Sequence, residues 1–214
     1  MEKIVYTKNI DVIELNKRNI VIDKQAEIEE GVIIGAGVCI LGRSKIAQNC
    51  EIGNNSVIDN SNLASGVKVL SSFIEYSFVG ERTTVGPYAT IKKETAVGDD
   101  CRIGNFVEIK KSKIGNGVKI AHLTYVGDAE VGDGCNVGCG VVFCNYNGAI
   151  KQKSIVGKDV FIGSNVNIIA PVLIEDEAYI AAGSTINKNI KRGQLSIARS
   201  HQMNKNNFKN PYKK

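Results

Sequence analysis

The chain has 214 residues, enough for one large domain or two small ones. Its hydrophobic content of 43% allows a sizeable core, but aromatic residues make up only 6% and Trp is absent, so small aliphatic side chains must fill that core. No apolar run approaches the ~18 residues of a membrane span, and the N-terminus lacks the apolar core of a signal peptide. These features argue against a membrane or secreted protein and favour a cytoplasmic one.

Charge is unevenly distributed along the chain. No Asp or Glu follows Glu177, and the residues up to Glu177 hold 19 basic against 22 acidic side chains. The basic residues after that point are Lys188, Lys191, Arg192, Arg199, Lys205, Lys209, Lys213 and Lys214. Such a tail can bind nucleic acid, but here no aromatic residues are interleaved with the charges and no recognition motif occurs. The basic C-terminal tail, 191–214, is therefore expected to be solvated or to lie near an anionic ligand, and neither nucleic acid nor membrane is an expected partner.

Residues 1–19 carry no repeat and are expected to form a short lead-in and cap, with a strand-like patch at 10–15. From there on an aliphatic residue returns at every sixth position, with the rhythm lost at 59–78, single residues dropped further on, and a ten-residue break after residue 144. The repeated positions are Ile22, Ile28, Ile34, Ile40, Ile46, Ile52, Ile58, Val79, Val85, Ile91, Val97, Ile103, Ile109, Ile114, Ile120, Val126, Val131, Val137, Val156, Ile162, Ile168, Ile174, Ile180 and Ile186.

A period of six fits neither an α-helix nor an alternating strand, but it is typical of a hexapeptide-repeat parallel β-helix. Each hexad is a short strand and a tight corner, and three hexads close one triangular coil. Gly, Asn or Asp at the corner tolerates a positive φ. The sequence therefore predicts an all-β fold, a parallel β-helix of about nine coils over residues 20–190. The break predicts a loop at 145–154 that leaves the side of the prism.

The six cysteines suggest neither zinc nor disulfides, because no CxxC pair occurs. Cys50, Cys101 and Cys135 all fall at one phase of the repeat, where a small buried residue is needed. We therefore expect reduced cysteines in the core.

The repeat also predicts which residues stack, since three hexads along the chain lead to the position directly overhead. Thr90, Glu108 and Tyr125 should form a line on one outward face, and Lys110 should lie one coil above Lys92. Lysines on this face favour an anionic substrate.

His122 is one of only two histidines. It falls two residues after Ile120, at a corner, with Asn105 expected one coil below and Cys139 one coil above. Inward positions hold small aliphatic residues, so a corner imidazole should face outward. A neutral imidazole can accept a proton from an amine or hydroxyl at neutral pH, and a nearby carboxylate such as Glu108 can orient it.

Two other site types fit poorly. Carbonic anhydrases of this architecture need three histidine ligands for zinc, and this chain has only His122 and His201, so no metal site is predicted. A nucleotide site would need a Gly-rich strand–loop–helix segment. No GxGxxG or P-loop match occurs, and no helical pattern follows one.

Four motifs resemble a known family. They are Gly104-Asn-Phe-Val-Glu-Ile-Lys-Lys, His122-Leu-Thr-Tyr-Val-Gly-Asp-Ala-Glu, Cys144-Asn-Tyr-Asn-Gly-Ala and Val160-Phe-Ile-Gly-Ser. Together they resemble the C-terminal domain of the bifunctional bacterial N-acetylglucosamine-1-phosphate uridyltransferase/glucosamine-1-phosphate N-acetyltransferase. The resemblance is close from about Val79 to Arg199 and looser back to Ile22.

The resemblance implies a left-handed β-helix, a homotrimer with active sites between subunits, and transfer of acetyl from acetyl-CoA to the amine of glucosamine 1-phosphate, with no metal required. It implies that His122 is the general base and Glu108 its partner. The residues implied to hold the sugar phosphate or line its site are Lys110, Tyr125, Asn136, Asn145, Tyr146 and Lys151. The residues implied to contact acetyl-CoA are Cys139, where the family usually has Ala, together with Ser164, Ala182 and Arg199.

Two departures from the family pattern leave alternatives open. Residues 1–19 are too short to be the uridyltransferase domain, and the family's Gly-Pro-Phe-Ala-Arg reads Gly86-Pro-Tyr-Ala-Thr here. Lys92 can supply the charge of the missing arginine. The acceptor could instead be a nucleotide-linked amino sugar, or the chain could be a non-catalytic trimeric scaffold. The retained set around His122 argues against a scaffold, which has no need of it.

Overall fold

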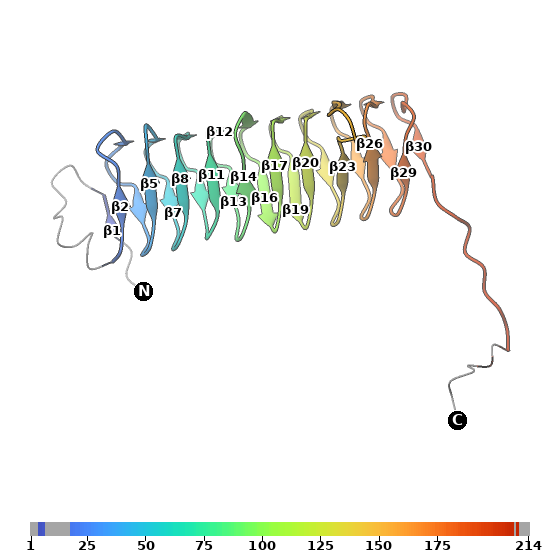
Figure 1. The fold of residues 1–214 in the computed structure, drawn as a ribbon, viewed down its shortest axis with the longest axis horizontal. Helices are drawn as coiled ribbons and strands as arrows, with labels where there is room; N and C mark the ends of the chain where they lie inside the picture. The colour runs from blue at the N-terminus through green and yellow to red at the C-terminus, as the bar shows by residue number, and fades with distance from the viewer. Residues whose placement is uncertain (1–3, 7–17, 208, 210–214) are drawn as a thin grey trace.

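The computed structural model describes residues 4–6, 18–207 and 209, which form one elongated prism (Figure 1). These residues contain strands and turns but no helix, and hence none that could cross a membrane. Three parallel sheets run the length of the prism, and each strand pairs with the strands one coil below and one coil above. The predicted parallel β-helix is confirmed, and the structure is consistent with the left-handed coil that the resemblance implies. The second sheet has 10 strands in the described chain, which makes about ten coils where about nine were expected.

Sheet A contains β1 (Ile4–Val5), β4 (Ile33–Ile34), β7 (Glu51–Ile52), β10 (Lys68–Val69), β13 (Thr84–Val85), β16 (Arg102–Asn105), β19 (Lys119–His122), β22 (Asn136–Val137), β25 (Phe161–Ile162), β28 (Tyr179–Ile180) and β30 (Leu195–Ser196). Sheet B contains β2 (Val21–Ile22), β5 (Cys39–Leu41), β8 (Val57–Asp59), β11 (Phe73–Glu75), β14 (Thr90–Ile91), β17 (Glu108–Lys110), β20 (Tyr125–Gly127), β23 (Val142–Cys144), β26 (Asn167–Ile169) and β29 (Thr185–Ile186). Sheet C contains β3 (Glu27–Ile28), β6 (Lys45–Ile46), β9 (Asn62–Leu63), β12 (Ser77–Val79), β15 (Thr95–Val97), β18 (Lys113–Ile114), β21 (Ala129–Val131), β24 (Ser154–Val156) and β27 (Leu173–Ile174).

The aliphatic residue of each hexad points into the prism. In sheet B, Ile91 pairs with Ile109 and Ile109 with Val126, and all three are completely buried, as the repeat predicted. The coils also continue through 59–78, where the sequence rhythm was lost. Leu63 and the other aliphatic residues of that stretch are buried at spacings of either five or six residues, so the fold persists although the strict period does not.

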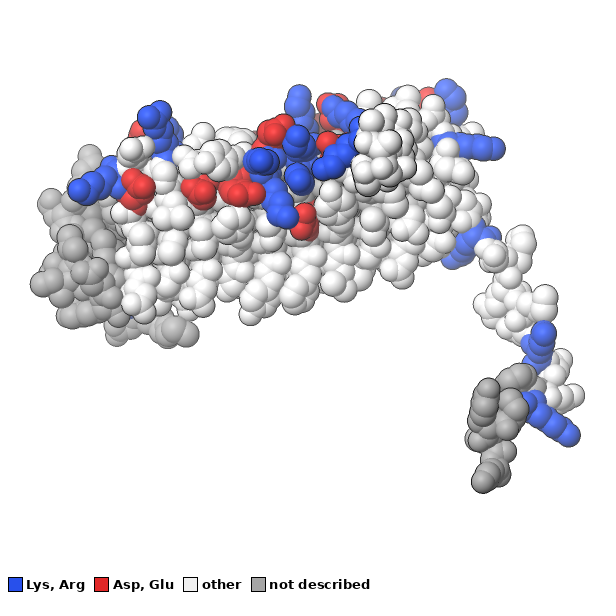
Figure 2. All heavy atoms as spheres, viewed as in Figure 1, with Lys and Arg blue, Asp and Glu red and all other residues white. Residues whose placement is uncertain are grey.

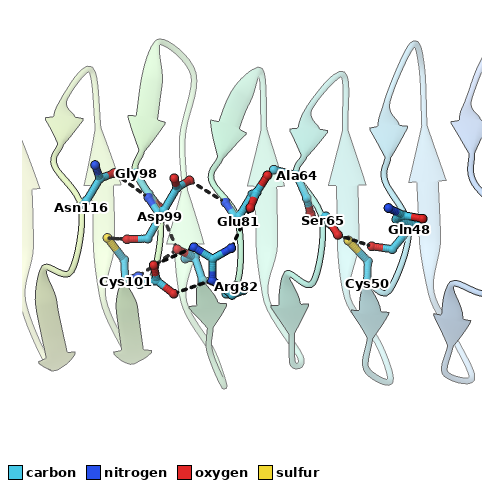
Figure 3. Close-up of polar contacts among 12 residues, drawn as sticks. Gln48, Cys50, Ala64, Ser65, Glu81, Arg82, Gly98, Asp99, Cys101 and Asn116 are labelled. Carbon is cyan, nitrogen blue, oxygen red and sulfur yellow. Dashed lines mark hydrogen bonds and ion pairs between the residues drawn. The ribbon is translucent and has the colours of Figure 1, made fainter.

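The edge where sheet C passes into sheet A is stabilised by side chain–backbone hydrogen bonds between coils (Figure 3). Asp99 Oδ1 accepts a hydrogen bond from the backbone N–H of Glu81 at 2.7 Å, and Asn116 Oδ1 accepts one from Asp99 at 2.8 Å. Asp133 and Asp176 repeat the contact higher up. These four bonds tie neighbouring coils together along this edge.

One residue per coil at this edge adopts positive φ. Gly117 and Asp100 are the kind of residue expected there, but Arg82 also has a φ of 55°. Its guanidinium binds the Asp100 carboxylate at two points, Nε to Oδ1 and Nη2 to Oδ2, each at 2.8 Å (Figure 3). The hydrogen bond from Arg82 keeps the pKa of Asp100 below its usual value.

Three cysteines occupy the buried position just after this edge, as predicted. Cys50, Cys101 and Cys135 are free thiols with almost no exposed surface. Burial raises the pKa of Cys50 and of Cys135 to about 11, because a thiolate is poorly solvated there. These cysteines are core residues and are inert near neutral pH.

The two ends of the prism differ. At the N-terminal end β1 pairs antiparallel with β4 and covers the edge of sheet A, while the strand expected at 10–15 lies outside the described residues. At the other end β30 pairs with β28, so the coils continue past Ile190, where the sequence suggested that the tail begins. The described residues after β30 extend away from the prism (Figure 1).

Candidate active site

His122 is the last residue of β19, at the edge where sheet A passes into sheet B. It pairs with Asn105 in the coil below, and a 3.4 Å hydrogen bond from the N–H of Gly140 to the His122 carbonyl places Cys139 one coil above. Both neighbours are those predicted. The side chain is exposed, and in the described part of the chain its ring nitrogens have no hydrogen-bond partner. The imidazole is therefore free to meet a ligand.

The residues implied to contact acetyl-CoA continue this edge toward the C-terminus. The residue after Ser164 donates its backbone N–H to the Cys139 carbonyl, and the residue after Ala182 donates to the Ser164 carbonyl, each at 2.8 Å. Arg199 then donates from Nη1 to the Ala182 carbonyl, also at 2.8 Å. One residue from each successive coil thus forms a line, here called the corner line, that begins at His122.

The outward face of sheet B carries the predicted acidic, phenolic and basic groups. Glu108 pairs with Tyr125, one coil above it, as expected. Lys92 Nζ lies 3.0 Å from Glu108 Oε1, and both side chains are roughly half-buried. No hydrogen bond joins Glu108 to His122 among the described residues. Lys110 has no ion-pair partner in the described chain, so it is the lysine of this face that remains available to an anion.

The side loop, residues 145–153, begins after β23 and ends one residue earlier than predicted, because residue 154 already belongs to β24. Tyr146 and Lys151 form an antiparallel bridge within it and are both exposed. An ion pair between Lys153 and Glu130 attaches its end to β21 and lowers the pKa of Glu130. The loop leaves from the edge between sheets B and C (Figure 1), and charged side chains are concentrated along this upper edge of the prism (Figure 2).

Asn145, at the root of the side loop, is only 7% exposed. Its Nδ2 donates to Asp128 Oδ2 at 2.5 Å and lies 3.5 Å from the hydroxyl oxygen of Tyr125. Sequence reasoning assigned no role to Asp128, although one of the family motifs contains it. The sequence gives no indication of the contact between Asp128 and Asn145, because that contact depends on the path of the side loop, which does not follow the repeat.

Asn136 is separated from the other residues implied to bind the sugar phosphate. It lies on sheet A, in register with Lys119, whereas Lys110 and Tyr125 lie on sheet B. A single chain therefore presents the predicted substrate residues on two faces and on the side loop. Over the same described residues, no group of three His, Cys, Asp or Glu side chains is arranged to hold a metal ion.

Comparison with known proteins agrees with this architecture. The family described as the GMPPB C-terminal domain matches residues 16–102 and 73–168, and the bacterial transferase hexapeptide repeat matches 153–188. The structure of LpxA, a UDP-N-acetylglucosamine acyltransferase from Bacteroides fragilis 9343, aligns with a TM-score of 0.53 at 20% identity, over 82% of this chain and 68% of that one. At this identity the likeness concerns the fold alone.

Closer relatives carry the name bifunctional protein GlmU. The protein of Clostridium novyi (strain NT) is 51% identical over 190 residues, which are 89% of this chain and 42% of the relative. That of Clostridium botulinum (strain ATCC 19397 / Type A) is 54% identical over 184 residues, or 86% and 40%. The chain thus spans less than half the length of these relatives. It belongs to the GMPPB C-terminal domain family of hexapeptide-repeat proteins, and the resemblance to the C-terminal part of GlmU that its motifs predicted is confirmed.

Proposed function

We propose that the chain is an acetyl-CoA-dependent N-acetyltransferase acting on an amino-sugar phosphate, with glucosamine 1-phosphate as the first candidate acceptor. The observation that carries this proposal is the position of His122, exposed and unpaired within the described chain, where the corner line meets the lysine-bearing face of sheet B. The thioester can lie along the corner line while an anionic acceptor binds the lysine-bearing face of sheet B. Similarity to the C-terminal part of GlmU supports the same chemistry.

In the proposed reaction His122 takes a proton from the acceptor's ammonium group, or from the amine as it attacks. The amine nitrogen forms a C–N bond with the thioester carbonyl carbon, and backbone N–H groups of the coil stabilise the oxyanion that results. When this intermediate collapses, the C–S bond breaks and the departing CoA thiolate takes the proton from the imidazolium. Where the acceptor starts as the ammonium, the second proton that its nitrogen loses passes to solvent. Glu108, one coil away, stabilises the imidazolium electrostatically. Proton transfer through His122 is sufficient, and no step calls for a metal ion.

The acceptor's phosphate is proposed to bind Lys110. This lysine has no competing carboxylate in the described chain, whereas Lys92 is paired with Glu108 and contributes charge only in part. A lysine binds phosphate as a point charge, without the two-point geometry of arginine. The Tyr125 hydroxyl can hydrogen-bond the sugar, and the Asn145 amide, 3.5 Å from that hydroxyl, packs against it.

We further propose a homotrimer with active sites between subunits. The side loop leaves the prism at one edge of sheet B and His122 lies at the other, while Asn136 faces a different direction on sheet A. Residues on separate faces can serve one substrate only if a second copy supplies some of them. Mixing a His122→Ala protein with a Lys151→Ala protein should then restore part of the activity, because mixed trimers contain some intact sites. Activity that is never restored would count against a shared site.

Acetyl-CoA is proposed to lie along the corner line, with its phosphates near Arg199. The free thiols of the core are consistent with a reducing compartment, and we propose the cytoplasm.

The function is tested by incubating the protein with acetyl-CoA and a panel of glucosamine 1-phosphate, glucosamine 6-phosphate, glucosamine and a nucleotide-linked amino sugar. Mass detection of the acetylated product avoids interference from the protein's thiols. Turnover that requires the 1-phosphate is the expected result. Turnover of the nucleotide-linked sugar alone would change the acceptor but keep the reaction, and no turnover of any amine would contradict the proposal.

A further inference from the structure

The side loop is folded by hydrogen bonds within itself. Asn147 Oδ1 accepts from the backbone N–H groups of Ala149 and Ile150, each at 2.9 Å, and the Tyr146 hydroxyl donates to the carbonyl two residues on at 2.6 Å. These bonds determine the shape of the loop. They do not determine how the loop is oriented on the prism, which depends on the residues at its root.

Asp128 contacts both ends of the loop. Its carboxylate Oδ2 accepts the hydrogen bond from Asn145 Nδ2 at 2.5 Å, and its backbone carbonyl accepts one from the N–H of Ser154 at 3.2 Å. Its own N–H donates to the carbonyl of Lys110 at 3.1 Å. Asp128 thus joins the first and last residues at the root of the loop to the strand that carries the proposed phosphate-binding lysine.

The residue before Asp128 explains why the contact is close. Gly127 lies one coil above Lys110, and a Cβ placed on it would come within 2.4 Å of the Tyr125 hydroxyl oxygen and 2.8 Å of Asn145 Nδ2. The Tyr125 ring and the Asn145 amide therefore pack over the bare glycine backbone. This packing leaves Asn145 nearly buried, so its amide must be satisfied within the protein, and the Asp128 carboxylate does this.

We propose that Asp128 is a positioning residue, which rests on the proposed function: by fixing Asn145 it orients the side loop and the Tyr125 hydroxyl toward the acceptor. Asp128 touches no reacting atom. Its loss should weaken acceptor binding and leave acetyl-CoA binding, along a different edge, unchanged.

The test compares Asp128→Gly with Asp128→Asn. Asp128 has a φ of 48°, a conformation that both Gly and Asn tolerate, so neither change strains the backbone. Gly removes the acceptor oxygen, whereas Asn retains one. Glu130→Gln is the matched control, because it removes the nearby ion pair to Lys153 without touching Asn145.

We expect Asp128→Gly to raise the KM for the acceptor about tenfold, because the loss of one charge-assisted hydrogen bond corresponds to a change of that size. The KM for acetyl-CoA should stay within twofold, and Asp128→Asn and Glu130→Gln should behave like the wild type. Hydrogen exchange of 145–153 should speed up more in Asp128→Gly than in either of the other two variants. Equal rises in both KM values, or an unchanged acceptor KM, would overturn the proposal. If the wild type acetylates nothing, the exchange measurement still decides whether Asp128 orients the loop, since unchanged exchange would overturn it.

Discussion

In the coils around the candidate site, two edges of the same prism use corner residues in opposite ways. At the edge between sheets C and A, the side chains of Asp99 and Asn116 accept hydrogen bonds from the backbone of the neighbouring coil. At the edge between sheets A and B, the side chains of Asn105, His122 and Ser164 have no such partner within the described chain. Both edges are built from the same six-residue repeat, so the difference lies in which groups remain unsatisfied.

Whether a polar side chain stabilises the fold or is available to a ligand depends on whether it is already hydrogen-bonded to a neighbouring coil, and not on its residue type. Asn116 and Asn105 are both asparagines, on different edges. Within the described chain only the side chain of Asn116 is hydrogen-bonded to the coil below it. An exposed polar group loses little by facing water, and it can exchange that water for a ligand. A group already bonded to the next coil cannot do so without weakening the fold. The edge with unbonded polar groups is therefore the one expected to carry the chemistry.

The largest effect is expected from removing the base. His122→Ala should slow acetyl transfer by about 10²–10⁴-fold, the usual contribution of a general base, and leave the melting temperature unchanged. Asn116→Ala should do the opposite, lowering the melting temperature with turnover intact, because it breaks an inter-coil bond on the other edge. Steady-state kinetics and thermal unfolding of both variants provide the comparison. A His122→Ala enzyme with near wild-type turnover would remove the proposed mechanism.

The next effect concerns two thiols. The pKa of Cys135 is raised to about 11 by burial, so at pH 8 only about one molecule in 10³ carries the thiolate. Cys139, on the corner line, is only partly buried. An alkylating reagent should therefore modify Cys139 at least about 10²-fold faster than Cys135, and acetyl-CoA should slow the reaction of Cys139 alone. Peptide mass mapping measures both rates. Equal protection of all six thiols by acetyl-CoA would indicate general stiffening in place of binding at the corner line.

The fold was predictable because the six-residue repeat has one geometric cause: an aliphatic residue returns to the same interior position of the prism. The stacks through Ile109 and Glu108 followed directly. The strict rhythm is lost at 59–78 because shortened turns change the spacing while the strands stay in register. Positive φ at Arg82 was also unexpected, since its ion pair with Asp100 lies one coil away and is not visible locally.

The candidate site was predictable where it lies on the repeat and not where it leaves it. The position of His122 between Asn105 and Cys139 required only counting. The ion pair between Glu108 and Lys92 depends on side-chain conformations, which the strand register alone does not determine. The role of Asp128 depends on how the side loop returns to the prism, and a loop outside the repeat has no period from which to infer its contacts.

A smaller effect is expected within the basic tail. Arg199→Ala should raise the KM for acetyl-CoA by about three- to tenfold, because a guanidinium near the CoA phosphates would be lost. Arg192→Ala is the matched control, since this guanidinium already binds Glu177, with Nη2 at 2.5 Å from Oε1. Initial rates at varied acetyl-CoA measure both. If both variants raise the KM alike, the tail acts by general charge and Arg199 has no special place.

The smallest effect concerns the bonded edge and its dependence on pH. Asp133 Oδ1 accepts from the backbone N–H of Asn116 at 2.9 Å, and Oδ2 lies 2.9 Å from Lys158 Nζ. Mainly through the hydrogen bond from Lys158, and next through that from Asn116, the pKa of Asp133 is lowered in the folded state. A lowered pKa contributes stability that is present above the unfolded value, about 3.9 for Asp, and is lost as the pH falls through the folded value.

Asp133→Asn keeps an oxygen for Asn116 but removes the ion pair. The pair is exposed and screened by solvent, so the variant should melt only about 1–2 °C lower than the wild type at pH 7. This gap should begin to narrow as the pH falls below the unfolded value of about 3.9, it should close once the pH is below the lowered pKa of the folded carboxyl, and it should shrink in 1 M salt. Thermal unfolding of both proteins from pH 7 to pH 3 measures the gap. A gap that does not narrow at all between pH 5 and pH 3 would mean that the backbone hydrogen bond, weakened by the amide, is the cause, and that the ion pair contributes nothing to this edge.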